Sequence, residues 1–321
     1  MSNEFGQEVM LTVTDQDGTK LVFDAAGLRV DFDVRLVDGF SRGTFTIYNL
    51  KETTIRALSN GENYVTVKTK LHGSQEYTVA NRFFISNVLE EKRLPNSITT
   101  LYCYDSLRKQ YLEEQVDIIV QRPSLRNQMQ QILRDIGYLG GITFQSFPEG
   151  KVDQVSLRPQ ASVQGTAQQC ISRLQFQYGF KLYTDIDSGF NCMYLPSLSE
   201  TPLTSLQDKE PDIILDVANM RANPKIGPAT LFVTSNLDGR IRPAAVLDTS
   251  KLITFSIDAT EETRQLANEF LKDTIAGFTK YQTLTVQHKG SNYTSEWRTV
   301  ATATSPTEGK SMPTISWQKG I

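Results

Sequence analysis

The residues that could perform acid–base or metal chemistry are few and dispersed along this 321-residue sequence. Its two histidines, His72 and His288, stand beside Gly73 and the pair Lys289-Gly290, so we expect both in solvent-facing turns. Two isolated histidines do not supply the nucleophile, base and orienting group that covalent catalysis needs. No serine-hydrolase, zinc-protease or nucleotide-binding motif occurs. We therefore predict no catalytic, cofactor-binding or metal-binding residue, and no cofactor.

Carboxylates leave one enzymatic alternative open. A glycosidase needs two carboxyl groups roughly 5 to 10 Å apart, and a sequence with 36 acidic residues does not exclude such a pair. None stands out, because the adjacent pairs are expected in solvent or at a helix N-terminus: Glu90-Glu91, Glu113-Glu114 and Glu261-Glu262.

Composition and charge exclude several classes of protein. The net charge of −3 argues against a nucleic-acid clamp, which needs a basic patch. Cys103, Cys170 and Cys192 are odd in number and far apart, so we interpret them as small apolar residues rather than disulfides or zinc ligands. No segment reaches the ~18 apolar residues of a membrane span, and residues 1–8 lack the features of a secretory signal. We expect synthesis and residence in a cytoplasm, without membrane insertion.

A strongly patterned segment lies near the N-terminus. Leu28, Val30, Phe32, Val34 and Leu36 alternate without interruption with charged residues. A strand of period two places these five on one buried face. The opposite face then carries four charges: Arg29, Asp31, Asp33 and Arg35.

The neighbouring segments extend this strand into a β domain. Residues 44–50 are rich in residues that favour strands, so they predict a hairpin with residues 28–36. Residues 53–58 predict a short helix, and a strand is predicted after it over 64–71. Residues 82–90 and 97–104 flank a charged turn and predict a second long hairpin. Together they predict a β-barrel or half-barrel over residues 1–105.

The pattern becomes mixed α/β over residues 106–210. Ser124 is placed to cap a helix that ends at Gly137, and a second helix is predicted over 166–178, with Gly179 at its end. A tight hairpin turning at residues 187–189 follows. The Ser-, Thr- and Pro-rich segment 196–211 predicts a linker.

The C-terminal part, residues 211–321, returns to strands around one long helix. A capping box between Asp258 and Glu261 predicts the start of that helix, and Gly277 its end. Strands are predicted over 282–288 and 297–304, joined by the turn K-G-S-N. The fold class expected for the chain is α+β and mainly β.

Several of these segments resemble baseplate hub proteins of contractile-tailed bacteriophages. In residues 29–61, R-V-D-F-D-V, T-F-T-I-Y-N-L and a short helix ending in A-L-S-N-G follow one another as in the N-terminal tube-like domain of that family. A helix ending in Y-G-F, followed by a hairpin, is similar to its middle domain. The segment L-D-G-R-I-R-P, residues 237–243, is similar to a turn of its second tube-like domain.

The resemblance implies a fold and a role. It implies two tube-like antiparallel β-barrel or half-barrel domains, 1–105 and 211–321, with an α/β middle domain and linker over 106–210. It implies a structural virion protein: a homotrimer that joins the sixfold tail tube above to the threefold central spike protein below. It also implies contacts with tape-measure and wedge proteins, only passing contact with DNA, and assembly in a bacterial cytoplasm into the tail baseplate.

Two alternatives stay open. A sixfold tail-tube or tail-tip initiator subunit would share such domains, and a peptidoglycan hydrolase of the tail tip would use the carboxylates. In the hub interpretation, Arg29, Asp31, Asp33 and Arg35 are candidate lumen-facing residues. Their mixed signs and weak net charge predict a channel that lets a polyanion pass without tight binding.

Overall fold

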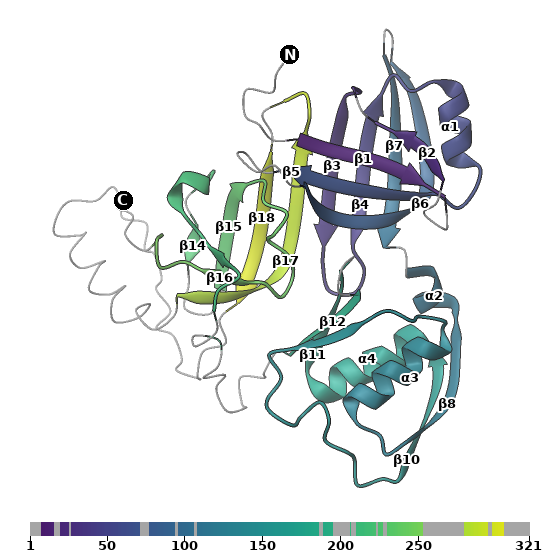
Figure 1. Cartoon of the computed structure of the whole chain (residues 1–321), viewed down its shortest axis with the longest axis vertical. Helices are drawn as coiled ribbons and strands as arrows, with labels where there is room; N and C mark the ends of the chain where they lie inside the picture. The colour runs from purple at the N-terminus through teal and green to yellow at the C-terminus, as the bar shows by residue number, and fades with distance from the viewer. Residues whose placement is uncertain are drawn as a thin grey trace, which may run out of the picture.

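The structure is a computed structural model of the chain, dominated by strands (Figure 1). It describes residues 8–15, 20–25, 27–70, 77–93, 96–105, 108–185, 189–194, 206, 210–222, 224–226, 230–252, 279–294 and 297–304. The prediction of a mainly β fold with few helices is confirmed.

One large sheet contains strands from both ends of the chain. Its strands are β1 (Glu8–Thr14), β2 (Leu21–Asp24), β3 (Val30–Leu36), β4 (Arg42–Tyr48), β5 (Tyr64–Lys70), β6 (Tyr77–Arg93), β7 (Asn96–Asp105), β13 (Ile213–Ile214), β14 (Lys225–Ile226), β15 (Thr230–Asn236), β16 (Val246–Asp248), β17 (Lys280–Ser291) and β18 (Arg298–Thr304). Their main order is β14-β15-β18-β17-β3-β4-β7-β6-β5-β1-β2, and β13 and β16 attach beside β17. This path has two ends, so the described strands form an open sheet and no closed barrel.

The predicted hairpins are confirmed in the N-terminal half. Strands β3 and β4 pair with Phe32 opposite Phe45, and β6 and β7 form the second hairpin. Helix α1 (Glu52–Ser59) and strand β5 lie where the sequence predicts them. In Figure 1, β1 and β5 cross over β3 and β4, and the apolar faces of these strands enclose one core. Gly43 leaves room there, because a Cβ atom at this position would lie 2.7 Å from the Phe45 ring.

The two halves meet where β3 pairs antiparallel with β17. The residues of β3 and β17 lie more than 240 positions apart in the sequence, yet they form adjacent strands. Side chains from both halves belong to the same hydrophobic core, including Leu231, Val233, Tyr281 and Ala301 from the C-terminal half. The parts predicted as two separate tube-like domains therefore share one sheet and one core.

Two expectations at the end of β17 are wrong. The predicted turn K-G-S-N begins too early, because β17 continues through Lys289 and Gly290 to Ser291. His288 consequently lies in a strand and is 1% exposed, where the sequence predicts a solvent-facing turn. The neighbouring glycine suggested a turn, but the pairing of β17 with β3 on one side and β18 on the other extends the strand past it.

The middle part of the chain forms a separate hydrophobic core. It contains α2 (Arg108–Glu113), β8 (Gln115–Gln121), α3 (Leu125–Asp135), β9 (Ile142–Gln145), β10 (Gln160–Thr166), α4 (Ala167–Tyr178), β11 (Phe180–Asp185) and β12 (Gly189–Tyr194). Helices α3 and α4 pack against a β10-β8 pair and a β11-β12-β9 sheet. A 3₁₀ turn, η1 (Val217–Asn219), follows β13.

The helix ends predicted in this region are confirmed. Ser124 accepts a hydrogen bond from the Asn127 backbone N–H at the start of α3. Thr166 and Gln169 form a complete capping box at the start of α4. Gly179 ends α4 at φ 70°, a left-handed conformation that favours glycine.

The loop between β3 and β4 connects the large sheet to the middle region. Asp38 accepts hydrogen bonds from the Lys181 ammonium at 2.7 Å and from the Leu182 backbone N–H at 3.1 Å. The Gly39 N–H donates to the Leu182 carbonyl at 2.8 Å, and the Phe40 ring packs edge-on to Tyr111 at 4.6 Å. These contacts fix the tip of the central hairpin in the middle region.

Several expectations fall on residues that the structure does not describe. His72, the predicted helix over 258–277 and most of the predicted linker 196–211 lie outside the described residues. The domain boundaries at 105/106 and 210/211 stay predictions. Among the described helices, none combines the length and apolar character of a membrane span.

Candidate functional surface

The face of the large sheet that points away from its core is polar and crosses both halves. We call it the polar face. Cross-strand partners define its central row: Asn236 on β15, Arg298 on β18, Lys289 on β17, Asp33 on β3, Thr44 on β4 and Tyr102 on β7. The four predicted residues lie on or beside this face, with side chains partly or fully exposed: Asp31, Asp33 and Arg35 on β3, and Arg29 just before it.

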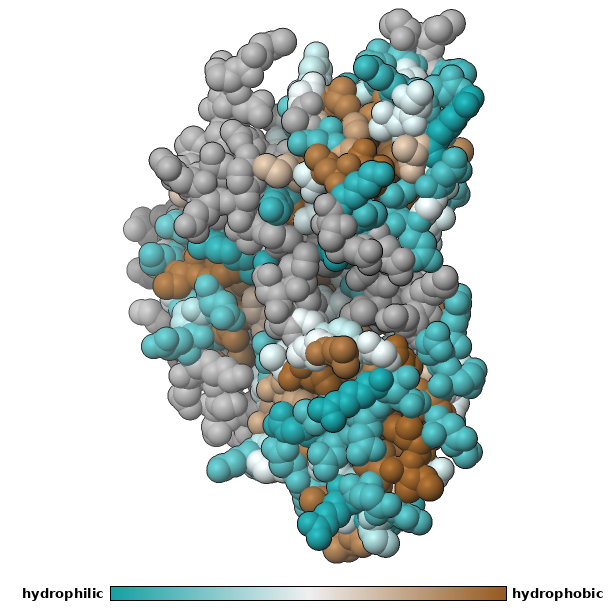
Figure 2. Space-filling view, turned by 45° about the vertical axis from the view of Figure 1, so that its right-hand side comes forward, coloured by the Kyte–Doolittle hydropathy of each residue, from teal (hydrophilic) through white to brown (hydrophobic). Residues whose placement is uncertain are grey.

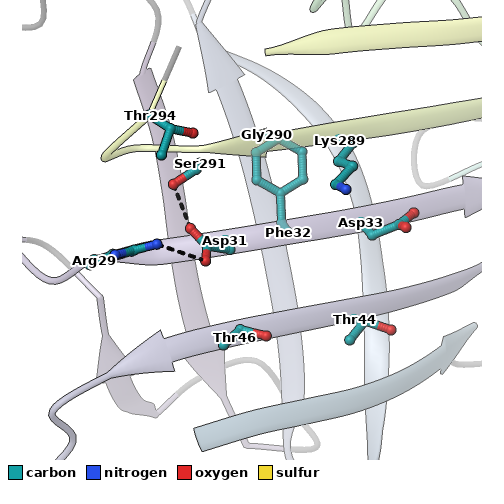
Figure 3. Close-up of a pocket in the computed structure, with 10 residues that line it drawn as sticks. All are labelled: Arg29, Asp31, Phe32, Asp33, Thr44, Thr46, Lys289, Gly290, Ser291 and Thr294. Atoms are coloured by element: carbon teal, nitrogen blue, oxygen red, sulfur yellow. Dashed lines mark hydrogen bonds and ion pairs between the residues drawn. The ribbon is translucent and has the colours of Figure 1, made fainter. Parts of the chain in front are cut away.

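Asp31 links three segments of the chain (Figure 3). Its carboxylate accepts hydrogen bonds from the Ser291 hydroxyl on β17 and from the Tyr48 hydroxyl on β4, the latter at 2.9 Å. The Arg29 guanidinium lies 3.5 Å from the same carboxylate. Arg29 also stacks over the Tyr48 ring at 4.2 Å and the Tyr293 ring at 5.1 Å, which are cation–π distances.

Asp33, two residues after Asp31 on β3, also contacts β17 and an arginine. It accepts two hydrogen bonds from the Gln287 amide on β17, at 2.8 and 2.9 Å. It also pairs with Arg35 at 3.3 Å, and the hydrogen bonds that Arg35 donates to Asp33 raise the pKa of Arg35. Both carboxylates therefore bind β17 to β3.

Asn292 completes the junction just beyond β17. Its side-chain oxygen accepts from the Val30 N–H at 2.8 Å, and its amide donates to the Leu28 carbonyl at 2.6 Å. The side chain thus satisfies two backbone groups at the start of β3, which would otherwise need water or another strand.

The face has two shallow hollows beside β3. One, of about 540 Å³, is shown in Figure 3 and includes Asp31, Thr46, Lys289 and Thr294 in its lining. The other, of about 260 Å³, is lined on the opposite side of Asp33 by Arg42, Tyr102 and neighbouring residues. Neither is an enclosed site for a small molecule, because both open on to the face of the sheet.

The chemistry of this surface is that of contact rather than catalysis. Asp31 and Asp33 project from the same side of one strand, at about the 7 Å spacing of residues i and i+2. Their oxygens already accept hydrogen bonds from Ser291, Tyr48 and Gln287, so neither is placed to donate a proton to a glycosidic oxygen. Within the described ranges, no cluster of three histidine, cysteine or carboxylate side chains forms a metal site. The three cysteines are buried, in agreement with their interpretation as apolar residues.

Sequence reasoning missed three cations of the polar face: Arg42, Lys289 and Arg298. The predicted strand began at residue 44, whereas β4 begins at Arg42, and the pairing of β17 with β3 was not predicted. That pairing places Lys289 opposite Asp33, with Arg298 opposite Lys289 on β18. Polar and apolar residues alternate in residues 285–291 and 298–304, which predicts strands with one polar side. The alternation does not specify which strands are neighbours.

The middle region has a different surface. Figure 2 shows separate apolar patches among hydrophilic ones on its outside. Its most exposed large apolar side chains are Leu139, Leu157 and Phe176. They lie on different elements and loops, and they do not form one continuous apolar surface with the polar face.

Comparison with known proteins gives structural matches only, since no protein-family model and no curated protein matches the sequence. A tail protein from Neisseria meningitidis MC58 has a TM-score of 0.53 at 10% identity, covering 94% of this chain and 96% of that one. The Escherichia coli c3393 protein is described as a type VI secretion component with structural similarity to the T4 bacteriophage tail proteins gp27 and gp5. It has a TM-score of 0.51 at 11% identity, covering 94% of this chain and 75% of that one.

A chain of the lidded Francisella PdpA-VgrG complex also matches. Its TM-score is 0.51 at 11% identity, over 94% of this chain and 53% of that one. At these identities the matches establish likeness of fold. The resemblance to phage tail proteins seen in the sequence is confirmed at that level, across most of the chain.

Proposed function

We propose that this protein is a structural component of a phage-type tail, and more specifically a baseplate hub. In this role three copies form a ring that joins a sixfold tail tube above to a threefold central spike below. The channel through the ring serves DNA passage, and the protein performs no chemistry of its own. Its location is the tail baseplate of the virion.

The observation that supports this proposal best is the junction between β3 and β17. The main path of the sheet runs β14-β15-β18-β17 on one side of the junction and β3-β4-β7-β6-β5-β1-β2 on the other, and the polar face crosses the junction. One chain therefore supplies two adjacent sheet units. Three chains related by a threefold axis would supply six units, the number that a sixfold tube requires.

The polar face is the proposed lumen. Its opposite face packs on the core with β1 and β5, so the polar side is the one available to line a channel. On this proposal Arg29, Asp31, Asp33 and Arg35 face the lumen, and neighbouring subunits cover the open edges at β14 and β2. Covering them removes rows of unpaired backbone groups that would otherwise pair with other chains.

The test is the particle mass of the purified chain, measured by light scattering with and without a co-expressed spike protein. A trimer, or a monomer that becomes three copies on the spike, would support the hub. Rings of six without the spike would instead indicate a tail-tube or tail-tip initiator subunit. A stable monomer that does not bind the spike protein and that digests peptidoglycan in a zymogram would indicate the hydrolase.

A further inference from the structure

Two pairs of like charges lie next to each other on the polar face. Arg35 on β3 is directly opposite Arg42 on β4, and Lys289 on β17 is directly opposite Arg298 on β18. Like charges at opposed positions destabilise a sheet. Arg35 pairs with Asp33 at 3.3 Å, and Lys289 lies opposite the same carboxylate across the β3–β17 pair. In the described part of the chain the other three cations make no ion pair.

The two carboxylates of β3 do not balance these cations. Asp31 accepts from Ser291 and Tyr48 and lies near Arg29, and Asp33 is held by Gln287 and Arg35. Both serve the β3–β17 junction. The predicted mixed signs concerned only the four residues Arg29, Asp31, Asp33 and Arg35, and the neighbouring strands add Arg42, Lys289 and Arg298 beside them.

The neighbours of the cations are mainly hydroxyl groups. Thr44 and Tyr102 continue the central row beyond Asp33, and Thr46 lines the larger hollow with Lys289. Arginine, lysine, threonine and tyrosine side chains are the usual partners of phosphate oxygens in protein–DNA contacts. Such contacts carry no sequence information. The hydroxyls and dispersed cations favour a phosphate backbone over a single small anion.

We infer that the polar face makes direct, sequence-independent contacts with the phosphate backbone of duplex DNA through Arg42, Lys289 and Arg298. This inference rests on the proposed function, since it assigns a ligand to the proposed lumen. The contacts are weak and dependent on salt, because few cations are involved and each releases counterions when it neutralises a phosphate. The negative net charge of the whole chain does not oppose them, because binding depends on the local cluster.

The experiment measures binding of the full chain to a fluorescent 30-base-pair duplex by anisotropy, at 50 and 200 mM salt. The test variant combines Arg42→Gln, Lys289→Gln and Arg298→Gln. The matched control combines Lys51→Gln, Arg134→Gln and Arg158→Gln, which remove the same charge at exposed positions off the polar face. Circular dichroism and light scattering of each variant establish that fold and particle mass are unchanged.

We expect the affinity of the wild type and of the control variant for the duplex to fall by the same factor between 50 and 200 mM salt. Loss of three phosphate contacts should flatten the slope of log K against log salt by about 2.7, so the test variant loses about 40-fold less affinity over the same fourfold rise in salt. Equal slopes for test and control variants would overturn the inference. Binding of polyglutamate but not duplex would also overturn it and assign the face to an acidic protein.

The hub proposal is tested by the particle mass, and the DNA contact is tested by binding to the duplex. A trimer that binds duplex equally well with and without the three cations refutes the DNA contact and leaves the hub standing. A ring of six, or a monomer that does not become three copies on the spike, refutes the hub, and DNA binding that depends on Arg42, Lys289 and Arg298 would then still support the phosphate contact.

Discussion

His288 should make the fold sensitive to acid. Its Nδ1 atom lies 2.9 Å from the Thr299 hydroxyl, which also accepts a hydrogen bond from the Asp238 N–H at 2.9 Å. Its Nε2 atom has no hydrogen-bond partner of ordinary geometry in the described structure, although the Ile241 backbone lies near the ring. Burial lowers the pKa of His288 to about 4, assisted by Arg242 and opposed by Asp238.

The direction of the effect follows from proton binding. The unfolded chain takes up a proton at a pKa near 6.5, whereas the folded chain keeps His288 neutral down to about pH 4. The unfolded state therefore binds more protons between these values, and stability falls as the pH falls from about 6.5 to 4. Between pH 7 and pH 5 this single group should cost about 2 kcal/mol of unfolding free energy.

The assay is urea unfolding at pH 7 and pH 5, at one protein concentration. His288→Gln, which keeps a hydrogen-bonding group but does not titrate, should lose about 2 kcal/mol less than the wild type over this interval. His72→Gln controls for the other histidine of the sequence and should behave as wild type. If wild type and His288→Gln lose the same free energy, the burial argument for His288 is refuted.

Three further substitutions test the contacts that organise the sheet, each by urea unfolding at pH 7. Asn292→Ala removes two hydrogen bonds at the β3–β17 junction and should cost about 1–3 kcal/mol; Asn292→Asp keeps the acceptor for the Val30 N–H but sets a carboxylate oxygen against the Leu28 carbonyl, so it should cost at least as much, and a smaller loss would contradict this account. Gly43→Ala inserts a Cβ atom 2.7 Å from the Phe45 ring and should cost about 1–3 kcal/mol, unless the ring moves freely, in which case stability would not change. Asp38→Ala should cost about 1–2 kcal/mol by removing the acceptor for the Leu182 N–H and should speed proteolysis between sheet and middle region; unchanged cleavage would show that the loop does not hold them.

Local signals predicted much of this fold. The alternation in residues 28–36 specified which face of β3 is buried, because a shift by one residue would expose its apolar side chains. Ser124 marked a helix start through a short-range interaction of its own side chain. Gly179 marked a helix end because it adopts a left-handed conformation.

The candidate surface was predicted only in part, for a physical reason. The charges of β3 were visible in the sequence, but the cations beside them come from strands that are distant in the chain. Strand pairing depends on the whole packed core, and period-two patterns at 28–36 and 285–291 are compatible with many neighbours. The same limit explains His288: its burial follows from pairing on both sides of β17, whereas the adjacent Gly290 predicted a turn.

The β3–β17 junction also sets the order in which the chain can fold. Strand β3 is synthesised well before its partner β17, which begins more than 240 residues later and is completed only at Ser291. Until then one edge of β3 has exposed backbone groups, a state that favours pairing with other chains. Proteins whose contacts join residues far apart in the sequence fold slowly, and the β3–β17 pair is such a contact. A nascent chain that stops before β17 should therefore aggregate, so that only chains that include β17 become available for assembly.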